Sequence, residues 1–442
     1  MKVLIVGAGI GGLTAALSLD AAGLAREIQV IDAAAELLPL GVGINLLPHA
    51  TRELIELGLG PELARIAVPT AEVVVMDVFG NRIWRGERGL GAGYDWPQYS
   101  VHRGELQALL LAAVRERLGA DSVRTGCSFV GAVEDEVLGP VRSQVVDRRT
   151  GDVETIASDI VIGADGLNSA VRAQFHPDEG PPRWSGVTMW RGCTEAEPFL
   201  TGRSMMWAGS NSKAKFVVYP VSAPRAGSGR ALINWVAEVR VADAVAQAPD
   251  WNRGGRLEDV APHFEGWSLA GVDVCALMAA SPKILEYPMT DRDPLPFWGR
   301  GRVTLLGDAA HPMYPIGSNG GSQAVLDARH LAYELARAKD RAEDPAAGLA
   351  AYEAVRRPPT SAIVLANRAF PMDPVLDLVA DRAPRGFAAI EDVLDPAEVA
   401  LIDQALRATT GTDAEELNRR PSLDVRPRRS DSGGEAAAVR RE

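Results

Sequence analysis

The chain has 442 residues, of which 47% are hydrophobic and 24% are charged, and its formal net charge is −12 at pH 7. This length allows two or three hydrophobic cores, and the composition is typical of a soluble globular protein. The acidic balance argues against a nucleic-acid-binding surface, and no stretch reaches the roughly 18 apolar residues of a membrane span. The three cysteines, Cys127, Cys193 and Cys275, show no metal-ligand spacing and no disulfide framework, which favours a reducing cytoplasm.

The first forty residues predict a dinucleotide-binding unit. Residues 2–6 are apolar and rich in Val and Ile, as in a buried parallel strand, and they lead into Gly7-x-Gly9-x-x-Gly12. Apolar residues recur at helical spacing from Leu13 to Leu24, and a second apolar strand ends at Asp32, 20 residues beyond Gly12. Phosphates would lie on the free N–H groups at the helix start, and Asp32 would accept hydrogen bonds from a ribose. The unit alone leaves NAD and FAD equally open.

Two later segments suggest contacts with such a cofactor. The glycine-rich residues 39–45 have two interpretations, a turn before a helix near Pro48 or a loop close to a flat cofactor. Arg103 stands at the start of a predicted helix, where a cation opposes the helix dipole, so we expect it to be held for an anion.

Two further apolar strands end in a glycine and an acid. The first leads into Asp165-Gly166, followed by a short helix with Ser169 as its cap, and the second leads into Gly307-Asp308. In open parallel sheets, ligands bind at such strand ends. Helices follow from Gln323 and from Tyr352, and we expect the second to break at the Pro-Pro pair that follows Arg357.

Residues 179–294 have a different texture, with strands separated by turns and without long helices between them. This pattern predicts a mainly antiparallel sheet. The segment is rich in tryptophan, which allows two interpretations, core packing or the wall of a pocket for a flat ligand. The tryptophans in question are Trp184, Trp190, Trp207, Trp235 and Trp251.

The three glycine–acid strand ends, in this order, resemble the single-component (group A) FAD-dependent aromatic hydroxylases, the para-hydroxybenzoate and salicylate hydroxylase superfamily. The resemblance runs from residue 1 to about residue 370. Within the superfamily the chain is most similar to phenazine hydroxylases, through residues 39–45, 98–107, 188–192, 250–260 and 287–311. The implied fold class is α/β, a Rossmann-like FAD-binding domain with an inserted, mainly antiparallel β-sheet substrate domain and C-terminal helices.

The resemblance also implies domain boundaries. We expect a discontinuous FAD-binding domain, a substrate-binding sheet domain, a C-terminal helical segment and a disordered tail. Their ranges are 1–70, 100–178 and 295–370 for the first, 71–99 and 179–294 for the second, 371–410 for the third and 411–442 for the tail.

The family pattern assigns residues to two sites, with no metal. The expected FAD-binding residues are Gly7, Gly9, Gly11, Gly12, Asp32, Gly43, Arg103, Cys127, Asp165, Gly307, Asp308, Gly317 and Asn319. The expected substrate-pocket residues are Ile44, Met189, Trp190, Tyr219, Tyr287, Pro315 and Ile316. No catalytic base stands out, and Pro315, Ile316 and Gly317 are expected to flank the flavin.

The implied function is an FAD-dependent monooxygenase that consumes NADH or NADPH and O₂. It would hydroxylate a phenazine carboxylate or another aromatic acid through a C4a-hydroperoxyflavin, with or without loss of CO₂. Two alternatives stay open, the same chemistry on a different polycyclic or antibiotic-type aromatic, and a flavin-binding redox sensor without catalysis. We expect a cytoplasmic monomer or homodimer that binds neither nucleic acid nor a membrane.

Overall fold

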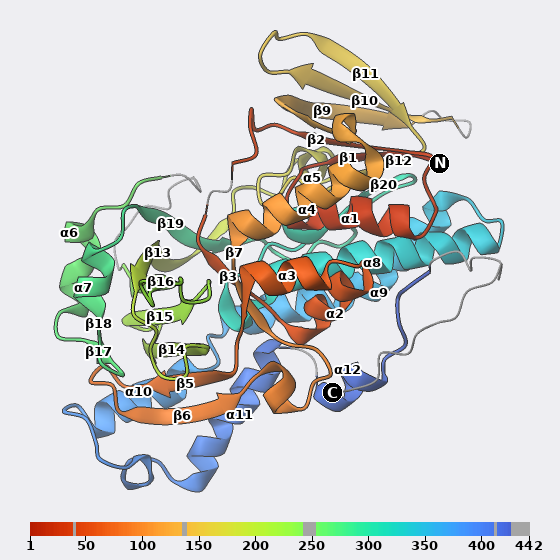
Figure 1. The fold of residues 1–442 in the computed structure, drawn as a ribbon. Helices are drawn as coiled ribbons and strands as arrows, with labels where there is room; N and C mark the ends of the chain where they lie inside the picture. Colours follow the sequence, from red (N-terminus) through yellow and green to blue (C-terminus); the bar gives the residue numbers. More distant parts are fainter. Residues whose placement is uncertain (39–40, 135–138, 242–252, 411–412, 426–442) are drawn as a thin grey trace.

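The computed structural model describes residues 1–38, 41–134, 139–241, 253–410 and 413–425. A five-stranded sheet forms around the N-terminal strand, and each of its pairings is parallel (Figure 1). The carboxyl ends of its strands therefore lie at one edge, where the glycine–acid segments follow. The strand order is β20 (Val303–Leu305), β12 (Ile160–Gly163), β1 (Lys2–Val6), β2 (Glu27–Asp32) and β8 (Val123–Thr125).

Helices cover this parallel sheet and share one apolar core with it. The helix predicted from Leu13 begins earlier, at Ile10, because the glycine motif itself forms its first turn. Among the described residues, no helix has the length and apolar character needed to cross a membrane. The main helices here are α1 (Ile10–Ala21), α2 (Pro48–Glu56), α3 (Gly60–Ile66), α4 (Arg103–Leu118), α5 (Ala170–Phe175), α8 (Asn319–Asp340) and α9 (Pro345–Arg368).

A seven-stranded sheet forms the second layer, and all its pairings are antiparallel except that of β14 with β5. The prediction of a mainly antiparallel sheet is confirmed. Strands from the two separate segments, 71–99 and 179–294, lie side by side in it, and the domain boundaries drawn around them remain a proposal. The order is β19 (Ile284–Asp291), β13 (Arg183–Ala196), β16 (Ala231–Arg240), β15 (Ala214–Pro220), β14 (Ser204–Gly209), β5 (Glu72–Met76) and β6 (Arg82–Glu87).

Different helices pack against the two faces of the seven-stranded sheet. One face buries Phe216 and Trp235 in a core shared with α6 (Leu257–Val260) and α7 (Val274–Ala279). The other face carries Trp207, Val217 and Tyr219, which belong to a core shared with α10 (Asp373–Arg382) and α11 (Pro396–Thr410). Alternation along each strand produces this division. Trp251 lies outside the described residues.

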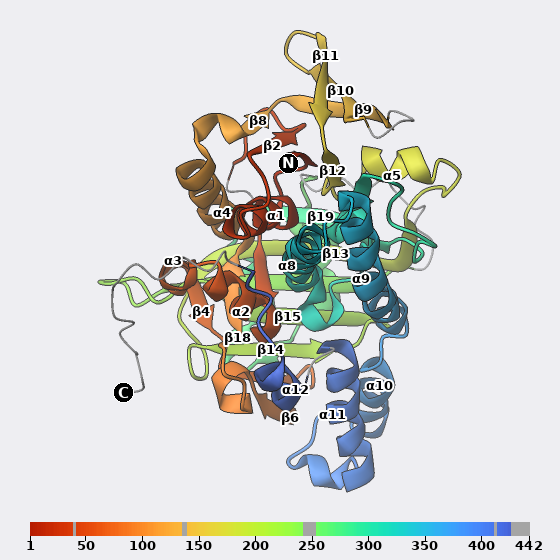
Figure 2. The same cartoon turned by 90° about the vertical axis from the view of Figure 1, so that its right-hand side faces the viewer.

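Smaller sheets complete the fold. The antiparallel β9–β11 sheet lies at the end of the molecule opposite α10 and α11 (Figure 2). The sheet β3–β7–β4 lies between the two large sheets and leads into α2 and α4. These strands are β9 (Cys127–Glu134), β10 (Val141–Asp147), β11 (Val153–Ser158), β3 (Gly43–Leu46), β7 (Tyr99–His102), β4 (Ala67–Pro69), β17 (Ser268–Leu269) and β18 (Val272–Asp273).

The predicted break in the helix at Pro358 and Pro359 was wrong, because α9 runs through both prolines. Both prolines and the preceding turn at residues 354–355 are exposed, so water can satisfy the carbonyl groups that lose an N–H donor. On the buried side, Thr360 Oγ1 donates to the carbonyl oxygens of Arg356 and Arg357 at 2.9 and 3.1 Å.

The predicted disorder of the tail was wrong for residues 413–425, whereas residues 411–412 and 426–442 lie outside the described residues. Residues 414–419 form α12 (Ala414–Arg419), and Leu417 is fully buried. Arg420 forms an ion pair with Glu53 of α2, which is also fully buried and is paired with Arg329 of α8. The polar composition of this segment predicts a disordered tail, but Arg420 is held by its ion pair with buried Glu53.

We predict that Arg420→Met lowers the free energy of unfolding by about 2 kcal/mol, because buried Glu53 then keeps only one guanidinium partner. Denaturant titration measures the change. Arg419→Met is the matched control, since exposed Arg419 pairs only with exposed Glu415, and it should shift stability by less than about 0.5 kcal/mol. Equal effects of the two substitutions would contradict the role of the buried pair.

A second prediction concerns pH. Burial, together with the nearby charge of Arg356, lowers the pKa of His49 and of His330 to about 3. The folded state therefore binds fewer protons than the unfolded state between pH 6.5 and about 3, so stability falls as pH falls through this window. His49→Gln should make the decline shallower, by up to about 1.4 kcal/mol per pH unit. The same change at exposed His263 should leave the slope as it is.

Candidate active site

The first glycine loop allows a close approach of backbone to backbone. Gly7 has φ +108°, and a Cβ there would lie 2.3 Å from the carbonyl oxygen of Ala164. A Cβ at Gly12 would lie 2.0 Å from the oxygen of Gly7, and one at Gly11 would lie 2.6 Å from Leu306 Cδ2. A Cβ at Gly9 would meet nothing within 4 Å of the described residues. The loop is therefore packed on its inner side and open at Gly9.

The open side of this loop faces the start of α1. Gly9 is the N-cap, and no side chain caps the helix, so its first N–H groups remain available to an anion. Gln107 of α4 fixes the loop from behind, where its Nε2 donates to the oxygen of Ala8 at 2.8 Å. The sequence analysis quoted Gln107 in a motif but assigned it no role.

Asp32 and Cys127 lie on the same side of the loop. Asp32 Oδ2 accepts from the N–H of Ala8 and Oδ1 from that of Ala34, each at 2.8 Å. The N–H of Gly126, just before buried Cys127, donates to the oxygen of Ala34 at 2.7 Å. The end of β2, the carboxylate of Asp32 and the backbone next to Cys127 therefore lie close together beside the glycine loop.

Arg103 begins α4 and is exposed. Its backbone N–H donates to the oxygen of Val42, and a Cβ at Gly41 would lie 3.6 Å from its Cβ, so it lies beside the second glycine-rich loop. Among the described residues, no carboxylate forms an ion pair with its guanidinium group. This uncompensated cation suits an anion such as a pyrophosphate.

A second helix start lies near the end of β20. Helix α8 follows two residues in the left-handed region, Gly317 with φ +69° and Ser318 with φ +60°, and no side chain caps it. A Cβ at Gly320 would lie 3.9 Å from Asp308 Oδ1, and one at Gly321 would lie 3.8 Å from Ile44 Cδ1. Asp308, Ile44 and the α8 N-terminus therefore meet, as expected for residues around a flavin.

The carboxylate of Asp165 is hydrogen bonded within its own segment. Its Oδ1 accepts from Ser169 Oγ at 2.5 Å and its Oδ2 from the N–H of Ala170 at 2.7 Å, so the carboxylate anchors the start of α5. Burial raises its pKa, against the effect of these hydrogen bonds. The Cα of Asp165 would lie 2.9 Å from a Cβ at Gly7, so this segment supports the glycine loop through its backbone.

A buried network holds the turn after β20 against α8. Asp327 accepts from the N–H of Gly307 at 3.0 Å and from Arg356 Nε at 2.8 Å, and it contacts His311 Nε2 at 2.5 Å. Burial would raise the pKa of Asp327, but His311 and Arg356 outweigh it and lower that pKa to about 2. The charged carboxylate thus fixes the turn that presents Asp308. Asn319, the first residue of α8, is fully buried beside this network, and its Oδ1 accepts from Gln323 Nε2 at 3.3 Å.

Three of the predicted pocket residues lie together on the face of the seven-stranded sheet that is opposite α7. Met189, Tyr287 and Ile316 belong to one apolar cluster. The cluster also contains Tyr314 and Phe370, whose rings stack with centroids 5.8 Å apart. The sequence offered no signal for Phe370, which lies at the very end of the segment that resembles the family.

Trp190 is not part of this cluster. It neighbours Met189 on β13, so its side chain lies on the opposite face, in the α7 core, where its Nε1 donates to Glu286 at 3.2 Å. Pro315 is exposed, and Ile44 packs against the parallel-sheet core rather than this cluster. We therefore remove Trp190 from the candidate pocket.

Arg191 had no role in the sequence analysis. Its side chain lies on the same face of the sheet as Met189, opposite the face of Trp190. Its Nη2 donates to the oxygen of Gly43 at 2.5 Å and its Nη1 to Tyr287 Oη at 3.2 Å. Tyr219 Oη also donates to the Gly43 oxygen, at 2.8 Å. Burial would lower the pKa of Arg191, but the tyrosine hydroxyls raise it more, so the guanidinium stays charged. Burial raises the pKa of Tyr219 to about 12, against the effect of Arg191.

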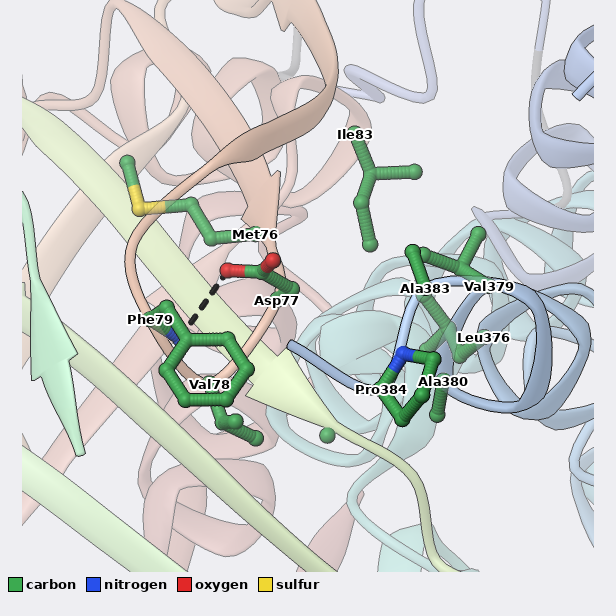
Figure 3. A pocket seen from close by; sticks show the side chains of 11 residues that line it. Met76, Asp77, Val78, Phe79, Ile83, Leu376, Val379, Ala380, Ala383 and Pro384 are labelled. Atoms are coloured by element: carbon green, nitrogen blue, oxygen red, sulfur yellow. Dashed lines mark hydrogen bonds between the residues drawn. The ribbon is translucent and has the colours of Figure 1, made fainter. Parts of the chain in front are cut away.

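An apolar cavity of about 160 Å³ lies elsewhere, between the β5–β6 hairpin and α10 (Figure 3). Its one carboxylate, that of Asp77, already accepts from the N–H groups of Phe79 and Asn81 at 2.9 and 2.8 Å. No predicted site residue lines it, so we do not take it as the active site. Figure 3 shows Ile83 and Phe79 facing Leu376 and Pro384 across this space.

Known proteins are similar to this chain in sequence. A family model described as an FAD binding domain matches residues 1–251 and 285–366. The phenazine 1,6-dicarboxylic acid hydroxylase of Lysobacter antibioticus is 51% identical over 368 residues, which is 83% of this chain and 89% of that protein. The chain belongs to the FAD-dependent aromatic hydroxylases. The 3-hydroxybenzoate 6-hydroxylase 1 of Aquipseudomonas alcaligenes is 33% identical over 362 residues, 80% of this chain and 84% of that protein.

Solved structures show the same fold for this hydroxylase. The HpxO protein of Klebsiella pneumoniae, in complex with FAD and uric acid, has a TM-score of 0.73 at 24% identity and covers 93% of this chain and 97% of its own. A salicylate hydroxylase substrate complex has a TM-score of 0.70 at 21% identity and covers 97% and 98%. The predicted family, fold class and FAD cofactor are confirmed, and the chain is an FAD-dependent monooxygenase.

We predict that Arg103→Gln weakens FAD binding by about 10- to 100-fold, as expected for the loss of one charged hydrogen bond of about 1.5–3 kcal/mol. Titration of the apoprotein with FAD, followed by flavin fluorescence, measures the dissociation constant. Arg115→Gln, at the exposed far end of the same helix, is the control and should bind FAD as the wild type does. Unchanged affinity in the Arg103 variant would remove this residue from the FAD site.

Proposed function

We propose that this hydroxylase acts on a phenazine carboxylate or a similar aromatic acid, with NADH or NADPH as reductant and O₂ as oxidant. The observation that carries the proposal is Arg191, a charged group for which no described carboxylate forms an ion pair. The Arg191 side chain is half-buried. A charge with limited access to water is costly unless it is paired, and a substrate carboxylate would supply the partner. The Lysobacter antibioticus relative is a phenazine 1,6-dicarboxylic acid hydroxylase, which agrees with this chemistry.

The same proposal gives FAD a path along the carboxyl edge of the parallel sheet. Asp32 would contact the ribose, and the start of α1 together with Arg103 would hold the pyrophosphate. Asp308 would contact the ribityl chain, and the N–H groups at the start of α8 would stabilise negative charge on the ring. The open space at Gly9 and the uncapped starts of both helices support this fit.

Bound FAD supplies hydride acceptance and the activation of O₂, of which one oxygen atom enters the ring and the other leaves as water. The chain's part is to bind, orient and exclude water. Met189, Tyr287, Tyr314 and Phe370 form an apolar wall, which limits the wasteful release of peroxide. Arg191 orients the acid end of the substrate, and we assign no side chain as a base. Because the reductant is an intracellular nucleotide and the three thiols are unpaired, we infer a cytoplasmic setting.

Aerobic NADH oxidation by the purified holoenzyme, with and without phenazine-1-carboxylate, tests the substrate. We expect the acid to accelerate NADH loss and the product mass to show one added oxygen. Loss of CO₂ in the same product places the hydroxyl group at the carboxylate-bearing carbon. An unchanged rate with only peroxide formed would contradict the phenazine substrate, and another polycyclic acid would then be tested.

We predict that Arg191→Met raises KM for the aromatic acid by about 30-fold or more, equivalent to about 2 kcal/mol for a lost desolvated charge pair. The uncharged carboxamide of the same acid should lose much less. Arg183→Met, on the same strand but exposed, should leave KM unchanged. FAD affinity, measured in parallel, should stay the same in both variants. Equal sensitivity of acid and carboxamide would contradict a carboxylate contact at Arg191.

A further inference from the structure

Four side chains form one straight row across the site face of the seven-stranded sheet. Arg191 on β13 pairs in register with Val236 on β16, which pairs with Val217 on β15, which pairs with Trp207 on β14. Neighbouring strands lie about 4.8 Å apart, so the Cα atoms of Arg191 and Trp207 are separated by about 14 Å. We call these four residues the Arg191 row. It has a cation at one end, an indole at the other and two valines between them.

Although Val236, Val217 and Trp207 share an apolar core with α10 and α11, they keep a small residual exposure in the middle of the sheet. Val217 and Val236 are each 7% exposed and Trp207 is 9% exposed. On the other face of the same strands, Phe216, Val218 and Trp235 are 0% exposed. The difference indicates that α10 and α11 cover the row incompletely, on the side that faces β3 and Gly43.

The rows on either side of the Arg191 row are covered. On one side, Asn234 accepts from the N–H of Gly43 at 2.7 Å and Tyr219 donates to its oxygen, so the start of β3 lies over them. On the other side, Lys215 Nζ lies 3.5 Å from Glu238 Oε2, which also accepts from Asn211 Nδ2 at 2.5 Å. The middle of α10 closes that side, where Asp377 Oδ1 accepts from Ser210 Oγ and Ser212 Oγ at 2.5 and 2.7 Å.

We propose that the Arg191 row is the floor of a groove that selects a planar aromatic acid of three fused rings. This inference rests on the proposed function. A one-ring acid held by Arg191 covers Val236 and leaves Val217 bare, whereas fused rings that cross both valines reach Trp207. Apolar contact over both valines then favours the longer substrate. Trp207 is the specificity-determining residue at the far end of the groove.

Trp207 is suited to that position. Lys215 Nζ lies 5.8 Å from the centre of its ring, so a cation–π contact holds the indole plane from the side of Glu238. Its indole N–H has no hydrogen-bond partner among the residues that the structure describes. An acceptor at the far end of a substrate, such as a second carboxylate, would give this donor a partner.

The test compares substrate binding by the FAD-loaded enzyme, followed by the change in the flavin absorption spectrum. The probes are phenazine-1-carboxylate, with three rings, and 3-hydroxybenzoate, with one. Val217→Phe fills the middle of the floor, and it should weaken the three-ring acid at least tenfold and the one-ring acid less than threefold. Val236→Leu adds one methylene beside Arg191 and should weaken both acids, which checks the direction of the groove should the larger substitution fail to fold.

A matched pair of tryptophan substitutions tests the far end. Trp207→Phe should weaken phenazine-1,6-dicarboxylate more than phenazine-1-carboxylate, whereas Trp84→Phe, in register with Val75 beyond Trp207, should change neither. Equal changes for one-ring and three-ring acids in Val217→Phe, or no change in either, would overturn the groove. A wild-type enzyme that binds none of these acids would instead overturn the proposed function itself.

Discussion

The contact of Gly43 with the seven-stranded sheet decides how the two halves of the site face each other. Its N–H donates to Asn234, and its carbonyl oxygen accepts from Tyr219 and Arg191. A Cβ at Gly43 would lie 2.6 Å from Val221 Cγ1, so only glycine lets β3 approach this closely. The strand that leads to the flavin-side loop is thereby fixed on the sheet that carries the proposed substrate floor.

Buried charges hold the other side of the site, and both of their networks meet on α8. Near its start, Asp327 ties the turn that carries Asp308 to Arg356 of α9. Further along, Arg329 pairs with Glu53 of α2, which the C-terminal segment also reaches through Arg420. Such pairs add little net stability over apolar packing, but breaking one is costly, so they select a single arrangement of these helices.

The loops that we expect on the FAD side of the site could be located in the sequence because their residues act locally. Gly7 and Gly12 are required by the close turn between a strand and the helix that follows, and Arg103 stands at the start of a single helix. Parallel pairing then brings the strand ends together at one edge. Asp165 shows the limit of this reasoning, since the carboxylate that we expected beside the cofactor anchors the start of α5.

The sequence by itself determined the dinucleotide-binding unit, the family resemblance and the mainly antiparallel character of the second sheet, because these follow from local patterns of apolar residues and glycines. Only the tertiary structure decided which side chains of β13 face the site. Met189 and Trp190 were both expected there, but successive residues of a strand lie on opposite faces of a sheet. The side chain of Trp190 packs in the core that the sheet shares with α7, and Met189 lies on the other face. The tertiary structure likewise revealed that Arg191 faces the site and that it aligns with Trp207 across the sheet. The register between distant strands is set by sheet assembly rather than by neighbours in the chain.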